Sequence, residues 1–295
     1  MPELGFENRD GWIWLDGEIV PWREARLHVL SHGLHYASSV FEGERAYNGS
    51  IFKSEDHSRR FRRSAELLDF VLPYSVELLE QAKYDILARN GLTDGYLRPV
   101  AWRGAEQTSI AAPDNKVHVA IACWEWLSYF DEETKMKGIK IGVAEFRRPD
   151  PMTAPSAAKA AGLYMICTIS KHRAMRAGYA DALMLDWQGR VAECTGANIF
   201  FVKAGELHTP IADCFLDGIT RRTVIELARQ LSIPVVERRI LPDELSSFEE
   251  CFVTGSAAEI TPVASIEDCK FRPAAATKAI MNAYTAATRR GTGRK

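Results

Sequence analysis

The sequence Pro155-Ser156-Ala157-Ala158-Lys159-Ala160-Ala161-Gly162-Leu163-Tyr164 places one lysine among residues too small to crowd it. A phenol follows five positions after the lysine, at Tyr164. A flat aldehyde cofactor needs such surroundings, because an amine must form a Schiff base with it and small side chains must leave room for its ring. The stretch is also typical of a solvated lysine at the start of an Ala-rich helix, so its interpretation depends on the rest of the chain.

The composition is that of an ordinary globular protein. The chain has 295 residues, of which 46% are hydrophobic and 26% charged, and its formal net charge is -2. This length is sufficient for two domains with large cores. A net charge so close to zero creates no overall field that would attract nucleic acid or anionic lipid. The one basic cluster, Arg289-Arg290 to Arg294-Lys295, is broken by glycine and is expected to be a disordered tail.

The cysteines indicate a reducing compartment. Six cysteines are spread from Cys123 to Cys269 without a C-x-x-C pair, so neither a disulfide framework nor a zinc knuckle is predicted. The first residues lack the basic and apolar regions of a signal peptide, and no apolar run approaches 18 residues. We therefore expect a cytoplasmic protein that does not bind membranes.

Local patterns predict a mixture of strands and helices. Asp16-Gly17, between Trp12–Leu15 and Glu18–Val20, favours a tight hairpin turn. Apolar spacing and end signals predict helices over 58–70, 76–90, 158–176, 220–231 and 275–287, and strands over 96–102, 117–124, 139–145, 182–186, 199–202 and 251–255. The helices do not alternate regularly with the strands, which argues against a Rossmann or barrel layout and favours an α+β fold.

A charged stretch divides the chain. Residues 131–138 read Asp-Glu-Glu-Thr-Lys-Met-Lys-Gly and interrupt the apolar pattern. We predict a linker there, between a smaller N-terminal domain at 1–130 and a larger, cofactor-binding C-terminal domain at 139–295.

Two loops in the second half are suited to binding an anion. Leu216-Asp217-Gly218-Ile219-Thr220 leads into a predicted helix, and Thr254-Gly255-Ser256-Ala257-Ala258 has the same combination of glycine, hydroxyl and small residues. Unpaired N–H groups at a helix start can bind phosphate. Both sequences are also ordinary turns and caps.

Two further candidates carry charge. Arg59-Arg60, followed by Arg62-Arg63, forms either a solvated basic face or a bidentate phosphate contact. Glu193 stands among apolar and small residues, and burying its carboxylate is costly unless it is paired. A protonated pyridine nitrogen would be a suitable partner.

Three histidines invite a metal interpretation. His28, His32 and His35 have helical spacing, but Gly33 lies among them and the next carboxylate is Glu42. A zinc site would need all three to converge with a further ligand. We therefore predict structural roles for these histidines and no metal.

Several longer motifs occur in a fixed order between Trp14 and about Pro262. Besides the Lys159 stretch they are His28-Val29-Leu30-Ser31-His32-Gly33-Leu34-His35-Tyr36, Ser39-Val40-Phe41-Glu42-Gly43, Tyr96-Leu97-Arg98-Pro99, Gly218-Ile219-Thr220-Arg221 and Gly255-Ser256-Ala257-Ala258-Glu259-Ile260-Thr261-Pro262. In these motifs the chain resembles the class IV aminotransferases, and most closely the branched-chain amino acid aminotransferases.

The resemblance implies a fold, a cofactor and an assembly. The implied fold is α+β and two-domain, the fold type IV shared with D-amino acid aminotransferase, with mixed sheets and flanking helices. The implied cofactor is pyridoxal 5'-phosphate, and the implied assembly is a homodimer or higher homo-oligomer.

The resemblance also assigns roles to residues. Lys159 would bond covalently to the cofactor and later move the reacting proton, Tyr164 would bond the ring hydroxyl, and Glu193 would pair with the pyridine nitrogen. Arg60, which matches the family arginine better than Arg59, would contact the phosphate together with Gly218, Ile219, Thr220 and Ser256. The positions that shape the substrate pocket match Tyr36, Phe41, Gly43, Tyr96, Arg98 and Ala257.

The implied reaction is transfer of an amino group between leucine, isoleucine or valine and 2-oxoglutarate, in two ping-pong half-reactions. The chain departs from the family at Gln107-Thr108-Ser109-Ile110, at Trp102-Arg103-Gly104 and at Asp217, where proline is usual. A carboxylate at position 217 would disfavour phosphate unless it is turned outward. These departures leave open a D-amino acid or (R)-amine transaminase, or an aminodeoxychorismate lyase, and a non-enzymatic protein with two anion-binding loops is a further alternative.

Overall fold

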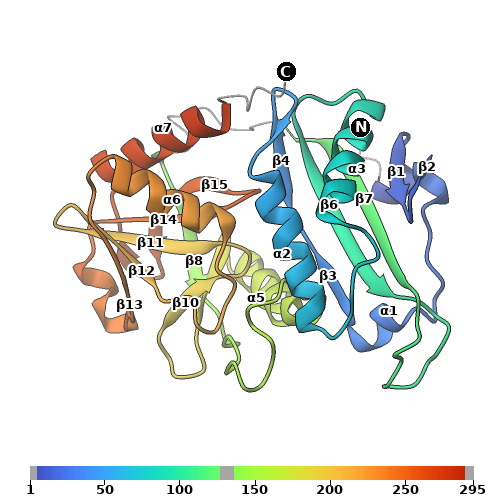
Figure 1. The fold of residues 1–295 in the computed structure, drawn as a ribbon. Coiled ribbons are helices and arrows are strands. Elements are labelled where there is room, and N and C mark those ends of the chain that lie inside the picture. Colours follow the sequence, from blue (N-terminus) through green and yellow to red (C-terminus); the bar gives the residue numbers. More distant parts are fainter. Residues whose placement is uncertain (1–4, 127–135, 290–295) are drawn as a thin grey trace. The chain divides into compact units, whose positions relative to one another are not determined.

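The computed structural model describes residues 5–126 and 136–289. Within these residues the chain forms two compact units (Figure 1). The first unit contains residues 5–126 together with Ala158–Gly162, and the second contains residues 136–157 and 163–289. The segment with Lys159 therefore packs with the first unit, although it follows the linker predicted at 131–138. Most of that linker and of the basic tail lies outside the described residues.

An antiparallel sheet is the basis of the first unit. Its described strands are β1 (Trp12–Leu15), β2 (Glu18–Pro21), β3 (Ser39–Phe41), β4 (Glu44–Tyr47), β5 (Ser50–Ile51), β6 (Gly95–Arg103) and β7 (Val117–Glu125). They follow the order β2-β1-β7-β6-β4-β5, and β3 pairs with β6. The long β6–β7 ladder forms the centre of this sheet, so side chains on β6 have a fixed position.

The predicted hairpin is confirmed. Leu15 faces Glu18 across the turn, and Asp16 and Gly17 have φ angles of 51° and 102°. A two-residue turn with two positive φ angles matches the right-handed twist of the strands, and Asp-Gly adopts it readily.

Helices α2 (Ser54–Leu67) and α3 (Val76–Arg89) pack on this sheet, and α1 (His32–Tyr36) is a short helix near β6. Ser75 begins α3 by accepting a hydrogen bond from the backbone N–H of Leu78. Apolar side chains of both long helices form one core with the strands, among them Phe61, Ala65, Leu79, Ile86, Leu97, Val119 and Ile121. Helix α2 begins four residues earlier than the predicted start at Ser58.

A mixed sheet is the basis of the second unit. Its described strands are β8 (Ile139–Val143), β9 (Asp181–Leu185), β10 (Val191–Cys194), β11 (Asn198–Lys203), β12 (Glu206–Pro210), β13 (Val235–Arg238), β14 (Glu250–Gly255), β15 (Glu259–Ile266) and β16 (Cys269–Lys270). The order is β10-β9-β8-β15-β14-β11-β12-β13, with β16 beside β15. Strand β8 is parallel to β9 and β15, and β12 is parallel to β13, while the other pairs are antiparallel.

Helices cover this sheet. Helix α5 (Met165–Arg176) contacts β8 and β9, whereas α6 (Ile219–Gln230) and α7 (Ala275–Arg289) contact each other and β14 (Figure 1). Residues of β11 are buried on both faces of the sheet, since Phe201 packs on Phe248 and Phe200 stacks on Phe252 at 5.2 Å. The continuous apolar pattern of β11 reflects this double coverage.

The predicted helix over 158–176 is wrong in its first part. Ala160 forms an antiparallel bridge with Val40, the turn η3 (Ala161–Tyr164) follows, and α5 begins only at Met165. The Ala-rich sequence favours a helix, but pairing with β3 supplies the backbone hydrogen bonds that a helix would otherwise provide, so tertiary context overrides propensity.

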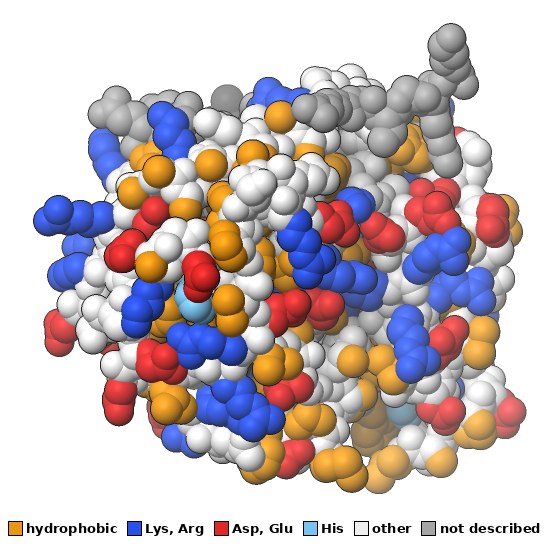
Figure 2. All heavy atoms as spheres, turned by 60° about the vertical axis from the view of Figure 1, so that its left-hand side comes forward, with side chains coloured by type: hydrophobic (Ala, Val, Ile, Leu, Met, Phe, Trp, Pro, Cys, Tyr) orange, Lys and Arg blue, Asp and Glu red, His pale blue; other side chains and the backbone are white. Residues whose placement is uncertain are grey.

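The surface carries charge of both signs. Lys and Arg side chains are interspersed with Asp and Glu over the face shown in Figure 2. This mixture agrees with the net charge of -2. Among the described residues, no helix combines the length and the apolar character required to cross a membrane.

Two adjacent leucines of α3 test the core of the first unit. Leu79 is 1% exposed and belongs to the core, whereas Leu78 is 57% exposed. We expect Leu79→Ala to lower the free energy of unfolding by about 2–5 kcal/mol, because it removes buried methyl groups and leaves a cavity. The matched control Leu78→Ala should change it by less than about 0.5 kcal/mol. Urea unfolding of both variants measures the difference, and equal losses would contradict the assignment.

Candidate active site

The residues predicted for the site lie on both units. The first unit carries Lys159, Arg60, Tyr36, Phe41, Gly43, Tyr96 and Arg98, and the second carries Tyr164, Glu193, Gly218, Ile219, Thr220, Ser256 and Ala257. Each set is described by itself.

Lys159 is held through its backbone. Its N–H donates to the Ser64 hydroxyl on α2 at 2.9 Å, and its carbonyl accepts from the N–H of Phe41 at 3.1 Å. Ser64 is fully buried and Lys159 is half-buried. The Lys159 side chain therefore extends from a backbone that is fixed to helix α2 on one side and to β3 on the other.

Phe41 brings a lysine and an arginine together. The Lys159 Nζ and the Arg98 guanidinium carbon each lie 5.0 Å from the centroid of the Phe41 ring. Arg98 comes from the centre of β6 and donates through Nη2 to the Tyr96 hydroxyl at 3.2 Å. Its buried Nε has no hydrogen-bond partner among the described residues. An arginine with an unused donor beside two aromatic rings can take a carboxylate while the rings take an apolar chain.

Tyr96 is fixed by aromatic neighbours and by a glycine. Its ring lies 5.1 Å from Trp124 and 5.3 Å from Trp126, centroid to centroid. A Cβ added at Gly43 would lie only 2.0 Å from the Tyr96 hydroxyl oxygen. The glycine between β3 and β4 is therefore what allows the phenol to reach this position.

Arg60 points inward, whereas Arg59 does not. Arg59 is exposed and pairs with Glu55 on the same helix. Arg60 forms a fork on the buried carboxylate of Glu42, with Nε–Oε1 at 2.7 Å and Nη2–Oε2 at 2.8 Å. Burial opposes ionisation of Glu42, but the charges of Arg60 and His57 and their hydrogen bonds outweigh it and hold the pKa of this carboxyl well below its usual range.

The three histidines have local hydrogen bonds. His32 joins the Ser38 hydroxyl at 2.6 Å and the carbonyl of Ser109 at 3.0 Å, and His35 bonds the carbonyl of Val29 at 2.9 Å. The ring of His28 accepts from the N–H of Leu30 at 3.2 Å. In the described ranges no group of three His, Cys, Asp or Glu side chains is arranged to hold a metal.

The unusual segments surround α1. Tyr36 is 47% exposed and donates to the Thr108 carbonyl at 3.3 Å, so Gln107–Ile110 lies against α1. Trp102 stacks on His118 at 5.5 Å, and its Cβ comes so close to Gly33 that a Cβ there would lie at 2.9 Å. The bulky Trp102 thus has a structural place beside α1.

In the second unit, Glu193 is a buried carboxylate held by an arginine and an asparagine. Arg148 Nη2 lies 2.8 Å from its Oε1, and the Asn198 side chain donates to its Oε2 at 3.0 Å. Burial would lower the pKa of Arg148, but the charge of Glu193 outweighs this and raises it. A carboxylate has about four acceptor sites, so it can accept hydrogen bonds from several N–H donors at once.

The start of α6 offers unused backbone donors. Gly218 occupies the N-cap position, and no described side chain caps this end. A Cβ at Gly218 would meet the Asn198 side-chain oxygen at 2.1 Å, so only glycine fits this close approach. The first N–H groups of α6, at Ile219 and Thr220, are therefore suited to bind an anion.

Asp217 is paired with a buried arginine of α6. Its Oδ1 lies 2.9 Å from Nη1 of Arg221, and the same guanidinium lies 2.7 Å from Glu237. Arg221 is almost fully buried, while Asp217 is 46% exposed. A carboxylate at this position is tolerated because a cation one helical turn later compensates its charge.

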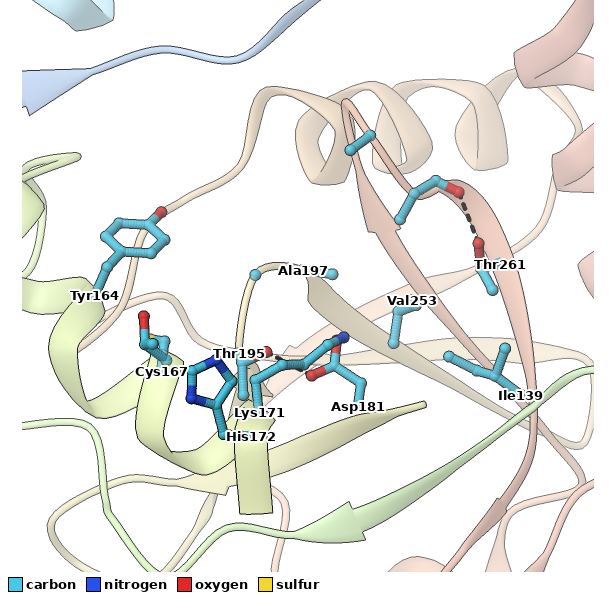
Figure 3. Close-up of a pocket in the computed structure, with 14 residues that line it drawn as sticks. Ile139, Tyr164, Cys167, Lys171, His172, Asp181, Thr195, Ala197, Val253 and Thr261 are labelled. Carbon is cyan, nitrogen blue, oxygen red and sulfur yellow. Dashed lines mark hydrogen bonds and ion pairs between the residues drawn. The ribbon is translucent and has the colours of Figure 1, made fainter. Parts of the chain in front are cut away.

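A cavity of about 560 Å³ lies in the second unit (Figure 3). Tyr164 stands on one side of it, and Ala257, in the turn with Ser256 that joins β14 to β15, lines it as well. Lys171 pairs with Asp181 at 3.2 Å, and Thr195 donates to the same carboxylate. The volume is adequate for a small molecule.

Several residues that hold the candidate side chains were not predicted from the sequence. Arg148 lies in a Pro-rich loop without periodicity, and Ser64 is an ordinary helical serine. Glu42 lies in the motif Ser39–Gly43, and Asn198 follows Glu193 by five residues. An acid or amide among apolar residues is a signal of a buried partner.

Comparisons with known proteins show the family of the chain. Residues 39–266 match the family model described as amino-transferase class IV. A protein of Rickettsia felis described as a probable branched-chain-amino-acid aminotransferase is 44% identical over 255 residues, covering 86% of this chain and 87% of that one.

Solved structures give the same result. The T.th. branched-chain amino acid aminotransferase with pyridoxamine 5'-phosphate has a TM-score of 0.92 and 38% identity, and 96% of each chain is covered. The same enzyme complexed with N-(5'-phosphopyridoxyl)-L-glutamate has a TM-score of 0.90 and 36% identity, with 97% and 96% covered. The predicted α+β fold with mixed sheets and flanking helices is confirmed by these matches.

Gly43 provides a test of the first unit's half of the site. We expect Gly43→Ala to displace Tyr96 and to lower the free energy of unfolding by about 1–3 kcal/mol, because the added methyl overpacks the contact. Gly196→Ala is the matched control, since a Cβ there meets nothing within 4 Å. Thermal unfolding and tyrosine fluorescence measure both effects. If Gly43→Ala were as stable as Gly196→Ala, the close approach would be wrong.

Proposed function

Because the chain belongs to the class IV aminotransferase family, we propose that it is a pyridoxal 5'-phosphate-dependent transaminase of branched-chain L-amino acids. It moves the amino group of leucine, isoleucine or valine to 2-oxoglutarate. The observation that carries the proposal is the placement of Lys159 and Arg98 next to the ring of Phe41. An apolar wall with one arginine suits both an aliphatic side chain and the second carboxylate of 2-oxoglutarate.

The described residues fit this cofactor. The uncapped start of α6 offers backbone donors for a phosphate, and Glu193 is a fixed carboxylate for a ring nitrogen. Lys159 supplies the amine, while Arg60 is a guanidinium whose orientation is fixed by Glu42. The Ser256 hydroxyl can bond the phosphate, and the Tyr164 hydroxyl can bond the ring. When bound, pyridoxal 5'-phosphate supplies the electron sink for the carbanion at the substrate Cα.

The chain's own residues orient the substrate and move the proton. Lys159 would hold the cofactor through its amine and would take the proton from the substrate Cα. Glu193 holds the ring nitrogen protonated, and Arg98 binds the distal carboxylate of 2-oxoglutarate or glutamate. Both substrates use these groups in turn, so the kinetics are ping-pong.

We also propose a homodimer. The first unit exposes large apolar side chains close together in sequence at Leu27, Val29, Leu30 and Leu34, and Ile110 of the neighbouring loop is 83% exposed. Exposed apolar surface of this kind is typical of a protein interface. A cytoplasmic setting is supported by the six cysteines, all of which are free thiols.

A donor screen tests the proposed reaction. We expect turnover of L-leucine, L-isoleucine and L-valine with 2-oxoglutarate, and none of D-alanine, (R)-1-phenylethylamine or 4-amino-4-deoxychorismate. Lys159→Ala should lower kcat by about 10²–10⁴-fold, because the proton-transfer group is removed. Product formation followed by chromatography measures both. Turnover of D-alanine or (R)-1-phenylethylamine without turnover of the branched-chain amino acids would indicate a D-amino acid or (R)-amine transaminase instead. A fully active Lys159→Ala variant would disprove the role of this lysine.

Glu193→Gln tests the ring-nitrogen partner. The amide carries no charge, so we expect a lower kcat with substrate affinity nearly kept. The variant also leaves Arg148 buried without a counter-charge and should lower the free energy of unfolding by up to about 3–5 kcal/mol.

A double variant separates the two effects. Glu193→Gln with Arg148→Met removes the uncompensated charge and should recover stability without recovering kcat. Recovery of kcat together with stability would show that Glu193 has only a structural role.

A further inference from the structure

We propose that Glu42 and Ser64 are positioning residues through which helix α2 holds Arg60 and Lys159 in one fixed spatial relation. Arg60 and Ser64 are four residues apart on α2, which places them on the same side of the helix and about 6 Å apart along its axis. The inference rests on the proposed function, because it concerns the groups assigned to the phosphate and to the covalent bond of the cofactor. All of the contacts that carry it lie within the first unit.

Glu42 determines which edge of the Arg60 guanidinium is presented. The carboxylate is fully buried and takes Nε and Nη2, the side-on edge of the group. A guanidinium is planar and rigid, so its end-on edge, which includes Nη1, is then directed away from Glu42. The backbone N–H of Glu42 donates to the Pro99 carbonyl at 2.8 Å, which ties the carboxylate to β6.

His57 strengthens the same attachment. Its Nδ1 lies 2.7 Å from Oε2 of Glu42, and the ring is 3% exposed. His57 precedes Arg60 by three residues on α2, so one carboxylate between β3 and β4 receives two side chains of the helix. Rotation or sliding of α2 would break several short, charge-assisted hydrogen bonds together.

The start of α2 is anchored separately. Lys83 of α3 donates to the carbonyl of Ser54 at 3.0 Å and pairs with Glu44 at 2.8 Å and Glu80 at 2.9 Å. The Ser58 hydroxyl donates to Glu80 at 2.7 Å. These buried contacts fix α2 against α3 and β4 without involving Arg60 or Lys159.

Ser64 connects this fixed helix to the lysine. Its hydroxyl accepts the Lys159 N–H, and the carbonyl of the same lysine accepts from Phe41. Both backbone groups of Lys159 are therefore used, one by α2 and one by the end of β3. The point of covalent attachment and the phosphate arginine thus follow the position of a single helix.

Binding of pyridoxal 5'-phosphate and of pyridoxal, which lacks the phosphate, tests the two roles separately. We expect Glu42→Gln to raise the Kd of pyridoxal 5'-phosphate by about 10-fold and to change the Kd of pyridoxal by no more than about 2-fold. Only the phosphate contact depends on Arg60. Ser64→Ala should raise the Kd of both aldehydes equally, by about 2–10-fold. The variant removes the hydrogen bond that fixes the backbone of Lys159, whose amine both aldehydes require. Absorbance titration gives the Kd values, and borohydride trapping with peptide mapping identifies the lysine.

Matched controls exclude a general effect of buried substitutions. Ser58→Ala removes a buried hydroxyl of the same helix that bonds Glu80, but it leaves the Lys83 contacts to Ser54, Glu44 and Glu80, which keep the start of α2 in place. Glu55→Gln removes an exposed carboxylate that bonds Arg59. Neither should change either Kd by more than about 2-fold.

Glu42→Asp keeps the proposal testable if Glu42→Gln does not fold. This variant retains the buried charge but shortens the side chain by one methylene, which moves the carboxylate away from Arg60. It should therefore also weaken the binding of pyridoxal 5'-phosphate selectively. The proposal would be overturned if the Glu42 variants raised the Kd of both aldehydes equally. It would also be overturned if Ser64→Ala had the same Kd values as Ser58→Ala. Failure of the unmodified protein to bind either aldehyde at Lys159 would instead disprove the proposed function.

Discussion

The backbone of Lys159 is the constraint on which the site of the first unit depends. A short segment that follows the first residues of the second unit returns to pair with β3 and α2. The lysine side chain is flexible, but its Cα is fixed by two hydrogen bonds to buried elements. A long side chain on a fixed base reaches a limited volume, so the backbone contacts restrict where the Lys159 amine can lie.

Buried charge has an orienting role in both units. Glu42 and Glu193 each have an arginine partner at hydrogen-bond distance and a second neutral or aromatic partner, His57 or Asn198. The net stabilisation from a buried ion pair is small, because desolvation of the two groups offsets their attraction. What such a pair provides is direction, since a bidentate or three-way contact permits one geometry. These carboxylates are therefore better explained by the groups they orient than by stability.

Local sequence was sufficient where local interactions decide the structure. Asp16-Gly17 specifies its own turn, and the amphipathic patterns of α3 and α6 predict those helices within about two residues. The motifs identified the family, while the choice of Arg60 over Arg59 as the phosphate contact stays a prediction. The conformation of Lys159 could not be predicted in the same way, because its partner Ser64 is 95 residues away. Arg148 was missed for the same reason, since nothing next to it in sequence indicates Glu193.

The Asp217 position shows how one departure from a family pattern can be compensated within one helical turn. A carboxylate next to an uncapped helix start would repel the anion that this start is suited to bind. Arg221 removes most of that repulsion, because it is nearly buried and takes Asp217 and Glu237 together. The local charge is then distributed over an acid–base–acid group whose two acids are half-exposed and screened by solvent. The aspartate at position 217 therefore alters the surface beside the loop. It leaves unchanged Gly218 and the backbone donors at the start of α6, which are the groups that would contact an anion directly.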